Sequence, residues 1–88
     1  MELKYRLSAS KHGVTEDSIR HAVAQALFVD DDFQEAEPPK MLIVGPDEAG
    51  NLLEIVGQLD ANDVLMVFHA MTVRTSILRL IGPIENER

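Results

Sequence analysis

The residues best suited to chemistry gather around His69 in the last third of the chain. His69 follows the apolar run 64–68, and Arg74 comes five residues later, where a helix is predicted to begin. Side chains and free backbone N–H groups converge at such a strand-to-helix corner, and a cation in the first turn of a helix opposes the helix dipole. Arg74 therefore indicates an anionic partner, with phosphate as the first candidate. Alternatively, His69 is a hydrogen-bonded edge histidine and Arg74 pairs with a carboxylate.

Three further residues could act with this pair. Glu54 is the carboxylate of an amphipathic segment, where it either performs acid–base chemistry or only faces water. Lys11 and His12 precede a predicted helix in a turn that contains Gly13, and loops of this kind often carry functional groups. His21 has the position of a boundary residue on that helix, so we interpret it as structural.

The chain has none of the familiar motifs of metal or nucleotide chemistry. It lacks a glycine-rich phosphate loop, His-Glu-x-x-His, Gly-x-Ser-x-Gly and a calcium loop. It also has no cysteine, which excludes disulfides, thiolate nucleophiles and the usual cysteine-containing zinc sites. We therefore expect no metal and no cofactor, and a cytoplasmic location. No apolar run approaches the roughly 20 residues of a membrane-spanning helix, so no membrane partner is expected.

Charge is distributed unevenly along the 88 residues. Fifteen acidic residues against eight basic ones give a net charge of -7, which argues against broad, sequence-independent binding to nucleic acid. Ten of the fifteen carboxylates lie between residues 30 and 63. Such asymmetry can separate a basic functional face from an acidic face that docks a basic partner. The triplet Asp30, Asp31 and Asp32 is interpreted as part of a solvated loop.

Periodicity and turn residues predict the elements that position these groups. Thr15 is the expected N-cap of a helix over 16–27, and Thr72 that of a helix over 73–81. Strands are predicted at 40–45, 52–59 and 64–71, with a short one near 27–31 and a loop over 31–39. The fold class is α+β: a small antiparallel sheet of three or four strands packed by an N-terminal and a C-terminal helix. One domain is expected over 1–82, followed by a short tail at 83–88.

The apolar positions of these elements predict the hydrophobic core. The side chains expected to be buried are Ile19, Val23, Leu27, Leu42, Val44, Leu53, Ile55, Met66, Phe68, Ile77 and Leu80.

Several short sequence words resemble one bacterial family. Lys-His-Gly-Val at 11–14, followed at once by a capped helix, is similar to the segment that opens the BrnT-like toxins of type II toxin–antitoxin modules. The words at 42–47 and 51–56, and His-Ala-Met-x-x-Arg at 69–74, look like the strands and final helix of a related toxin-like group. The resemblance covers about residues 11–81. It departs from the family where BrnT-type toxins have an arginine-rich stretch after the last strand, because this chain has only Arg74 and Arg79 there.

The resemblance implies a fold of the RelE/ParE superfamily and a ribonuclease that cleaves messenger RNA until a cognate antitoxin binds it. In that role His69 would be the general base or acid, assisted by Glu54, while Arg74, Lys11 and His12 would bind the RNA. The alternative is a non-catalytic interaction module of the same fold, which binds a protein through a strand edge and its acidic segment.

Overall fold

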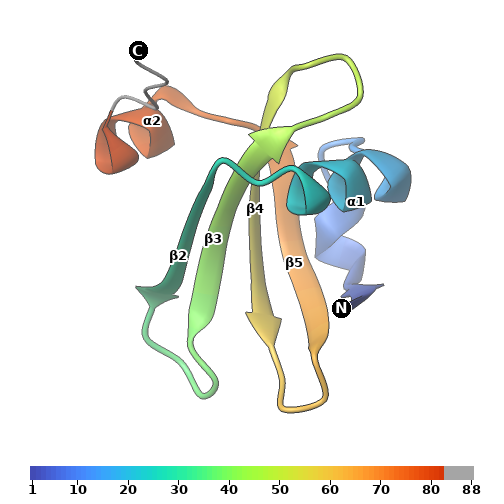
Figure 1. Cartoon of the computed structure of the whole chain (residues 1–88), viewed down its shortest axis with the longest axis vertical. Coiled ribbons are helices and arrows are strands. Elements are labelled where there is room, and N and C mark those ends of the chain that lie inside the picture. The colour runs from blue at the N-terminus through green and yellow to red at the C-terminus, as the bar shows by residue number, and fades with distance from the viewer. Residues whose placement is uncertain (83–88) are drawn as a thin grey trace.

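The computed structural model describes residues 1–82, so the predicted tail at 83–88 lies outside the described residues. Residues 1–82 form five strands, two α-helices and one short 3₁₀ helix (Figure 1). In chain order these are β1 (Glu2–Tyr5), η1 (Leu7–Ser10), α1 (Glu16–Ala24), β2 (Phe28–Gln34), β3 (Lys40–Pro46), β4 (Leu52–Leu59), β5 (Val64–Thr72) and α2 (Thr75–Ile81).

The strands form one mixed sheet in the order β1-β5-β4-β3-β2. The four strands β2 to β5 are antiparallel neighbours, whereas β1 pairs in parallel with β5 at the edge. The predicted α+β class is therefore confirmed, but the sheet has five strands rather than three or four, and it is not wholly antiparallel. Strand β1 has only four residues and pairs with a segment about sixty positions away, so no local pattern could reveal it.

The first helix begins as the sequence predicts and ends earlier. The Thr15 side chain accepts a hydrogen bond from the Ser18 backbone N–H at 3.1 Å, which confirms the N-cap. The helix stops at Ala24 rather than 27, because the Leu27 N–H already donates to the Val44 carbonyl of β3.

The last helix starts later than predicted. Thr72 pairs with Leu53 as the final residue of β5, and the Val73 N–H donates to the Leu52 carbonyl at 2.9 Å. Arg74 therefore occupies the N-cap position and Thr72 does not. The sheet ladder continues for two residues more than the turn chemistry of Thr72 suggested.

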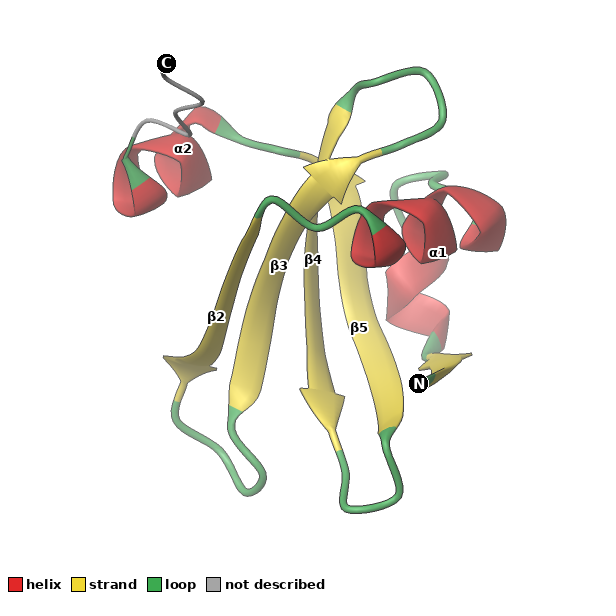
Figure 2. Ribbon diagram, in the orientation of Figure 1, coloured by secondary structure: helices red, strands yellow, loops and turns green. Residues whose placement is uncertain are grey.

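Each face of the sheet has its own apolar cluster. Residues Ile43, Ile55 and Val67 pack with Ile19 and Ala22 of α1 on one face. Leu42 and Val44 pack with Ile77 of α2 on the other, which we call the α2 face. Both helices lie toward the same end of the strands, whereas the end near the turns at 35–39 and 60–63 is not covered by either helix (Figure 2).

The predicted core is correct for most of its strand residues and wrong at two helix-associated leucines. Leu27 and Leu80 are 54% and 63% exposed. Leu27 lies beyond the true end of α1, and Leu80 lies on the outer side of the short helix α2. Val23, Met66 and Phe68 are half-buried.

The phase of β5 explains the partial exposure of Met66 and Phe68. The fully buried side chains of β5 are Leu65, Val67 and Ala70, which belong to the cluster on the same face as α1. The run 64–68 is apolar at every position, so its sequence could not say which residues face inward.

The acidic segment contains a strand. Strand β2 includes Asp30, Asp31 and Asp32, and only residues 35–39 form the connection to β3. The predicted solvated loop at this triplet is thus wrong, although Asp31 and Asp32 are exposed. Because β2 lies at the edge of the sheet and β3 is its one neighbour, its charges stay in water.

Candidate functional site

Glu54 is the centre of a charged cluster on the α2 face. It is the one charged residue among residues 1–82 that is fully buried, at 0% exposure. Its Oε2 accepts hydrogen bonds from His69 Nε2 at 2.8 Å and from Arg74 Nη2 at 2.6 Å. Arg74 Nε lies 3.0 Å from the same oxygen, and the Arg74 backbone N–H donates to Oε1 at 2.8 Å. The carboxylate is thus held from three directions.

Strand pairing brings these three residues together. Glu54 on β4 is opposite Met71 on β5, and the adjacent pair on this face is Val56 opposite His69. The register shifts between Val56 and Gly57, so β5 carries one extra residue at Phe68–His69. A bulge of this kind re-aims side chains. Here it places consecutive Phe68 and His69 beside one partner residue, with His69 directed toward Glu54.

The sequence prediction of an anionic partner for Arg74 is met within the chain. The partner is Glu54, which is the carboxylate alternative rather than a bound phosphate. Helix α2 has seven residues, and the N–H at its N-cap position is already used by Glu54. The premise that Arg74 lies in the first turn of the last helix is therefore wrong, because the helix begins at Thr75. The Arg74 side chain is still 53% exposed, and its Nη1 has no protein partner among residues 1–82.

Glu54 is ionised in the folded protein. Burial alone would raise the pKa of Glu54, but the hydrogen bonds from the Arg74 side chain, the Arg74 backbone and His69 outweigh that effect and hold the pKa below its usual value. The same hydrogen bond and charge raise the pKa of Arg74. In this form both carboxylate oxygens already accept hydrogen bonds from Arg74 or His69.

An ionised Glu54 fixes the tautomer of its histidine. A carboxylate only accepts hydrogen bonds, so the proton of neutral His69 must lie on Nε2. The lone pair is then on Nδ1. A carboxylate that orients an imidazole in this way leaves the other ring nitrogen ready to take a proton. The His69 side chain is 25% exposed.

Of the other predicted residues, His12 joins the cluster. Its ring lies edge-on to that of His69, with 5.6 Å between centroids and 78° between planes. Within residues 1–82, Lys11 makes no hydrogen bond or ion pair with this group and is exposed at the end of η1. His21 lies 2.9 Å from the Pro46 carbonyl through Nδ1, which supports its structural interpretation.

The sequence did not single out a second feature of the same face. Arg6 and Lys40 both lie over the Phe68 ring, 5.6 Å and 5.3 Å from its centroid. These cations are 34 residues apart in the chain, and no spacing rule links them. Only the order of the strands in the sheet could have indicated that Arg6 and Lys40 both lie near Phe68.

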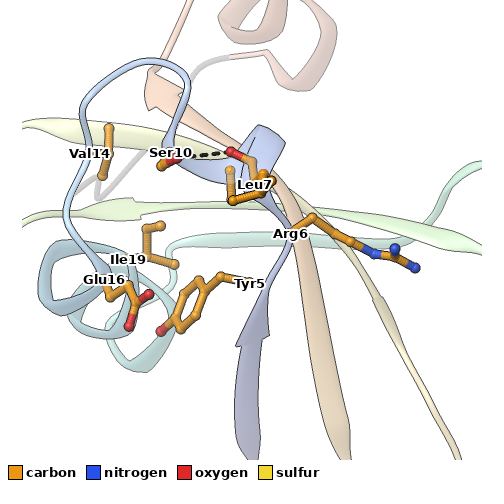
Figure 3. A pocket seen from close by; sticks show the side chains of 8 residues that line it. Tyr5, Arg6, Leu7, Ser10, Val14, Glu16 and Ile19 are labelled. Carbon is orange, nitrogen blue, oxygen red and sulfur yellow. Dashed lines mark hydrogen bonds between the residues drawn. The ribbon is translucent and has the colours of Figure 1, made fainter.

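A cavity of about 120 Å³ lies between β1, η1 and the start of α1 (Figure 3). Tyr5 and Glu16 line it together with Ile19, and the buried Tyr5 hydroxyl has no partner among residues 1–82. Burial raises the pKa of Tyr5, which keeps the phenol neutral. Tyr5 and Ile19 belong to the α1 side of the sheet, so this cavity is separate from His69.

The comparisons with known proteins give no further guide. The chain matches no family model, no curated protein and no solved structure. Within residues 1–82 there is no group of three or more histidine, cysteine or acidic side chains that could hold a metal ion. No helix in this part of the chain is long and apolar enough to cross a membrane.

Proposed function

We propose that this protein is a metal-independent endoribonuclease, the toxin of a BrnT-like toxin–antitoxin pair with a RelE/ParE-like fold, acting on messenger RNA. The observation that carries the proposal is the Glu54–His69 hydrogen bond of 2.8 Å beside an exposed Arg74. The resemblance of residues 11–14 and 69–74 to the toxin family supports the choice of RNA as substrate.

Each group has a defined part in the proposed reaction. His69 Nδ1 takes the proton from a ribose 2′-hydroxyl, and the 2′-oxygen attacks the adjacent phosphorus. The bond from phosphorus to the 5′-oxygen breaks, and His12, whose ring lies 5.6 Å from that of His69, supplies the proton that the leaving oxygen takes up. The products are a 2′,3′-cyclic phosphate and a 5′-hydroxyl.

The cationic side chains of Arg74 and Lys11 bind the negatively charged phosphates of the RNA. Arg74 Nη1 binds a non-bridging phosphate oxygen as negative charge develops, which is the task of a preorganised cation. Lys11 binds RNA further along the strand. Glu54 is a positioning residue, because its oxygens are occupied by Arg74 and His69.

The experiment is an incubation of purified protein with mixed messenger RNA in the presence of a metal chelator. We expect fragments with 2′,3′-cyclic phosphate ends, and no cleavage where the 2′-hydroxyl is replaced by hydrogen. Intact RNA at high protein concentration, or fragments with 3′-hydroxyl ends, would contradict the proposal.

The second candidate is a non-catalytic interaction module, and the edge strand β2 favours it. Its outer edge is unpaired among residues 1–82, and it carries exposed Val29 beside exposed Asp31 and Asp32. Such an edge can accept a strand from a basic partner. In the toxin proposal this is the surface for the antitoxin, so only RNA cleavage separates the two functions.

A further inference from the structure

A hollow on the α2 face, next to His69, is unlike the rest of this acidic protein. It has a volume of about 290 Å³ and includes Lys4, Arg6, Met66 and Phe68 in its lining. Lys40 lies beside the hollow, with its Nζ 5.3 Å from the centroid of the Phe68 ring. We call this hollow the basic groove.

The cations of the basic groove are not neutralised. Lys4, Arg6 and Lys40 form no ion pair with any of residues 1–82, in a chain whose net charge is -7. The acidic residue in the lining is Asp60, whose Oδ1 accepts the backbone N–H groups of Asn62 and Val64 in the turn. The groove therefore keeps a local positive charge, which favours an anionic ligand.

The floor of the groove is apolar. Met66, Phe68, Pro38 and Val64 line it, and Phe68 holds Arg6 and Lys40 close to its ring. A cationic rim over an apolar, aromatic floor is the arrangement that binds single-stranded nucleic acid, because phosphates meet the cations while unpaired bases contact the floor. A duplex hides its bases, and an acidic peptide offers charge without flat rings.

The strand register shows that the basic groove lies next to the charged cluster of Glu54, His69 and Arg74. Lys40, Gln58, Met66 and Lys4 form one row across β3, β4, β5 and β1. His69 lies beside Val56, two positions along β4 from Gln58, which is a step of about 7 Å in a strand. Groove and cluster are therefore neighbours on one continuous face.

We infer that the basic groove is a subsite for single-stranded RNA, holding the nucleotides that flank the bond cleaved at His69. This inference rests on the proposed function for the identity of the strand, but binding in the groove does not need cleavage. Arg6 and Lys40 bind phosphates, and Phe68 with Met66 contacts a base.

The test measures binding of a fluorescent oligodeoxyuridylate, which has no 2′-hydroxyl and cannot be cleaved by the proposed reaction. The variants are Arg6→Gln, Lys40→Gln and Phe68→Leu. The matched control is Arg20→Gln, which removes an exposed cation from α1 on the other face. Each lost groove cation should reduce the slope of log Kd against log salt by about 0.7. Phe68→Leu should weaken binding about 5-fold, within the range for a lost base–aromatic contact.

The outcomes separate this inference from the proposed function. Weaker binding by the groove variants with unchanged binding by Arg20→Gln supports the groove, even if wild-type protein cleaves no RNA. Equal affinity of all four variants and wild type would overturn it, even if RNA is cleaved. Equal affinity for polyglutamate of the same charge, or tighter binding of duplex, would also overturn it. Thermal melts of each variant identify any loss caused by unfolding, and Lys4→Gln then repeats the test.

Discussion

At the scale of single residues, Glu54 determines what His69 can do. A buried carboxylate is stable here because Arg74 supplies both its side chain and its backbone N–H. The carboxylate in turn keeps the His69 proton on Nε2. Removing Glu54 should therefore affect stability and chemistry together.

Glu54→Gln tests the stabilising part of this cluster. The glutamine NH₂ would face the donors of Arg74 and His69, so we expect a loss of about 1.5–3 kcal/mol in the free energy of unfolding near neutral pH. Because the pKa of Glu54 is below 4.5 in the folded chain, its contribution is fully present above that value and is lost as pH falls through the folded pKa. Denaturant melts should show the two proteins converging in acid.

Glu48→Gln is the matched control for that measurement. A hydrogen bond from Ser18 lowers the pKa of Glu48, but this side chain is exposed. Its substitution should change stability by no more than about 0.5 kcal/mol. A Glu54→Gln protein as stable as this control at every pH would contradict the buried cluster.

The hydrogen-bond partners of His69 and His21 predict opposite tautomers for the two rings. His69 faces a carboxylate through Nε2, whereas His21 faces the Pro46 carbonyl through Nδ1. In their neutral forms, His69 should carry its proton on Nε2 and His21 on Nδ1. Long-range ¹H–¹⁵N spectra measure both in one sample. The Nδ1–H form of His69 would show that its lone pair points to Glu54 and is not available to substrate.

At the scale of elements, α2 is held to the sheet by its buried Ile77, with half-buried Ile81 packed against the same cluster. Ile77 is 6% exposed against Leu42 and Val44, whereas Leu80 of the same helix is 63% exposed. Ile77→Ala should cost about 2 kcal/mol or more, and Leu80→Ala about 0.5 kcal/mol or less. Denaturant melts of the pair check this, and equal losses would mean that α2 packs by its other side.

The elements also show what the sequence could and could not predict. Strand β4 has the predicted bounds 52–59, because charged residues alternate with apolar ones and polar turns flank it. In β5 the run 64–68 is apolar at every position, so the sequence does not show which side chains face inward, and it wrongly predicts a fully buried Phe68. The bulge at Phe68–His69 depends on pairing with β4, which no local pattern reveals.

The sequence predicts which residues belong to the candidate site but not how they contact one another. His69, Arg74 and Glu54 were named because of their types and positions, and all three meet. Their contacts depend on the adjacency of β4 and β5 and on the exact point where β5 ends. From the sequence, a carboxylate partner for Arg74 is one of two alternatives, and nothing in it identifies that carboxylate as Glu54.

At the scale of the whole molecule, charge is divided between two regions. The basic groove carries Lys4, Arg6 and Lys40, whereas β2 carries Asp30, Asp31 and Asp32 at the sheet edge. The proposed RNA and antitoxin surfaces are thus of opposite sign.

Neutralising the three aspartates of β2 tests that division. Replacing Asp30, Asp31 and Asp32 with asparagine should slow association with a basic antitoxin and reduce the salt dependence of its rate. Stopped-flow mixing at low salt measures the rate. RNA binding in the groove should be unchanged or slightly tighter, and an unaltered antitoxin rate would place that partner elsewhere.

The most direct test of the catalytic assignment is the single-turnover rate of RNA cleavage by His69→Ala beside His21→Ala, in chelator and under identical conditions. His21 is the matched control because its ring contacts the Pro46 carbonyl and makes no hydrogen bond to Glu54, His69 or Arg74. We expect His69→Ala to lose roughly 10² to 10⁴ in rate, the usual effect of a lost general base. His21→Ala should cleave at nearly the wild-type rate once its folded fraction is matched. Equal rates for the two variants, or no cleavage by the wild-type protein, would contradict the catalytic assignment.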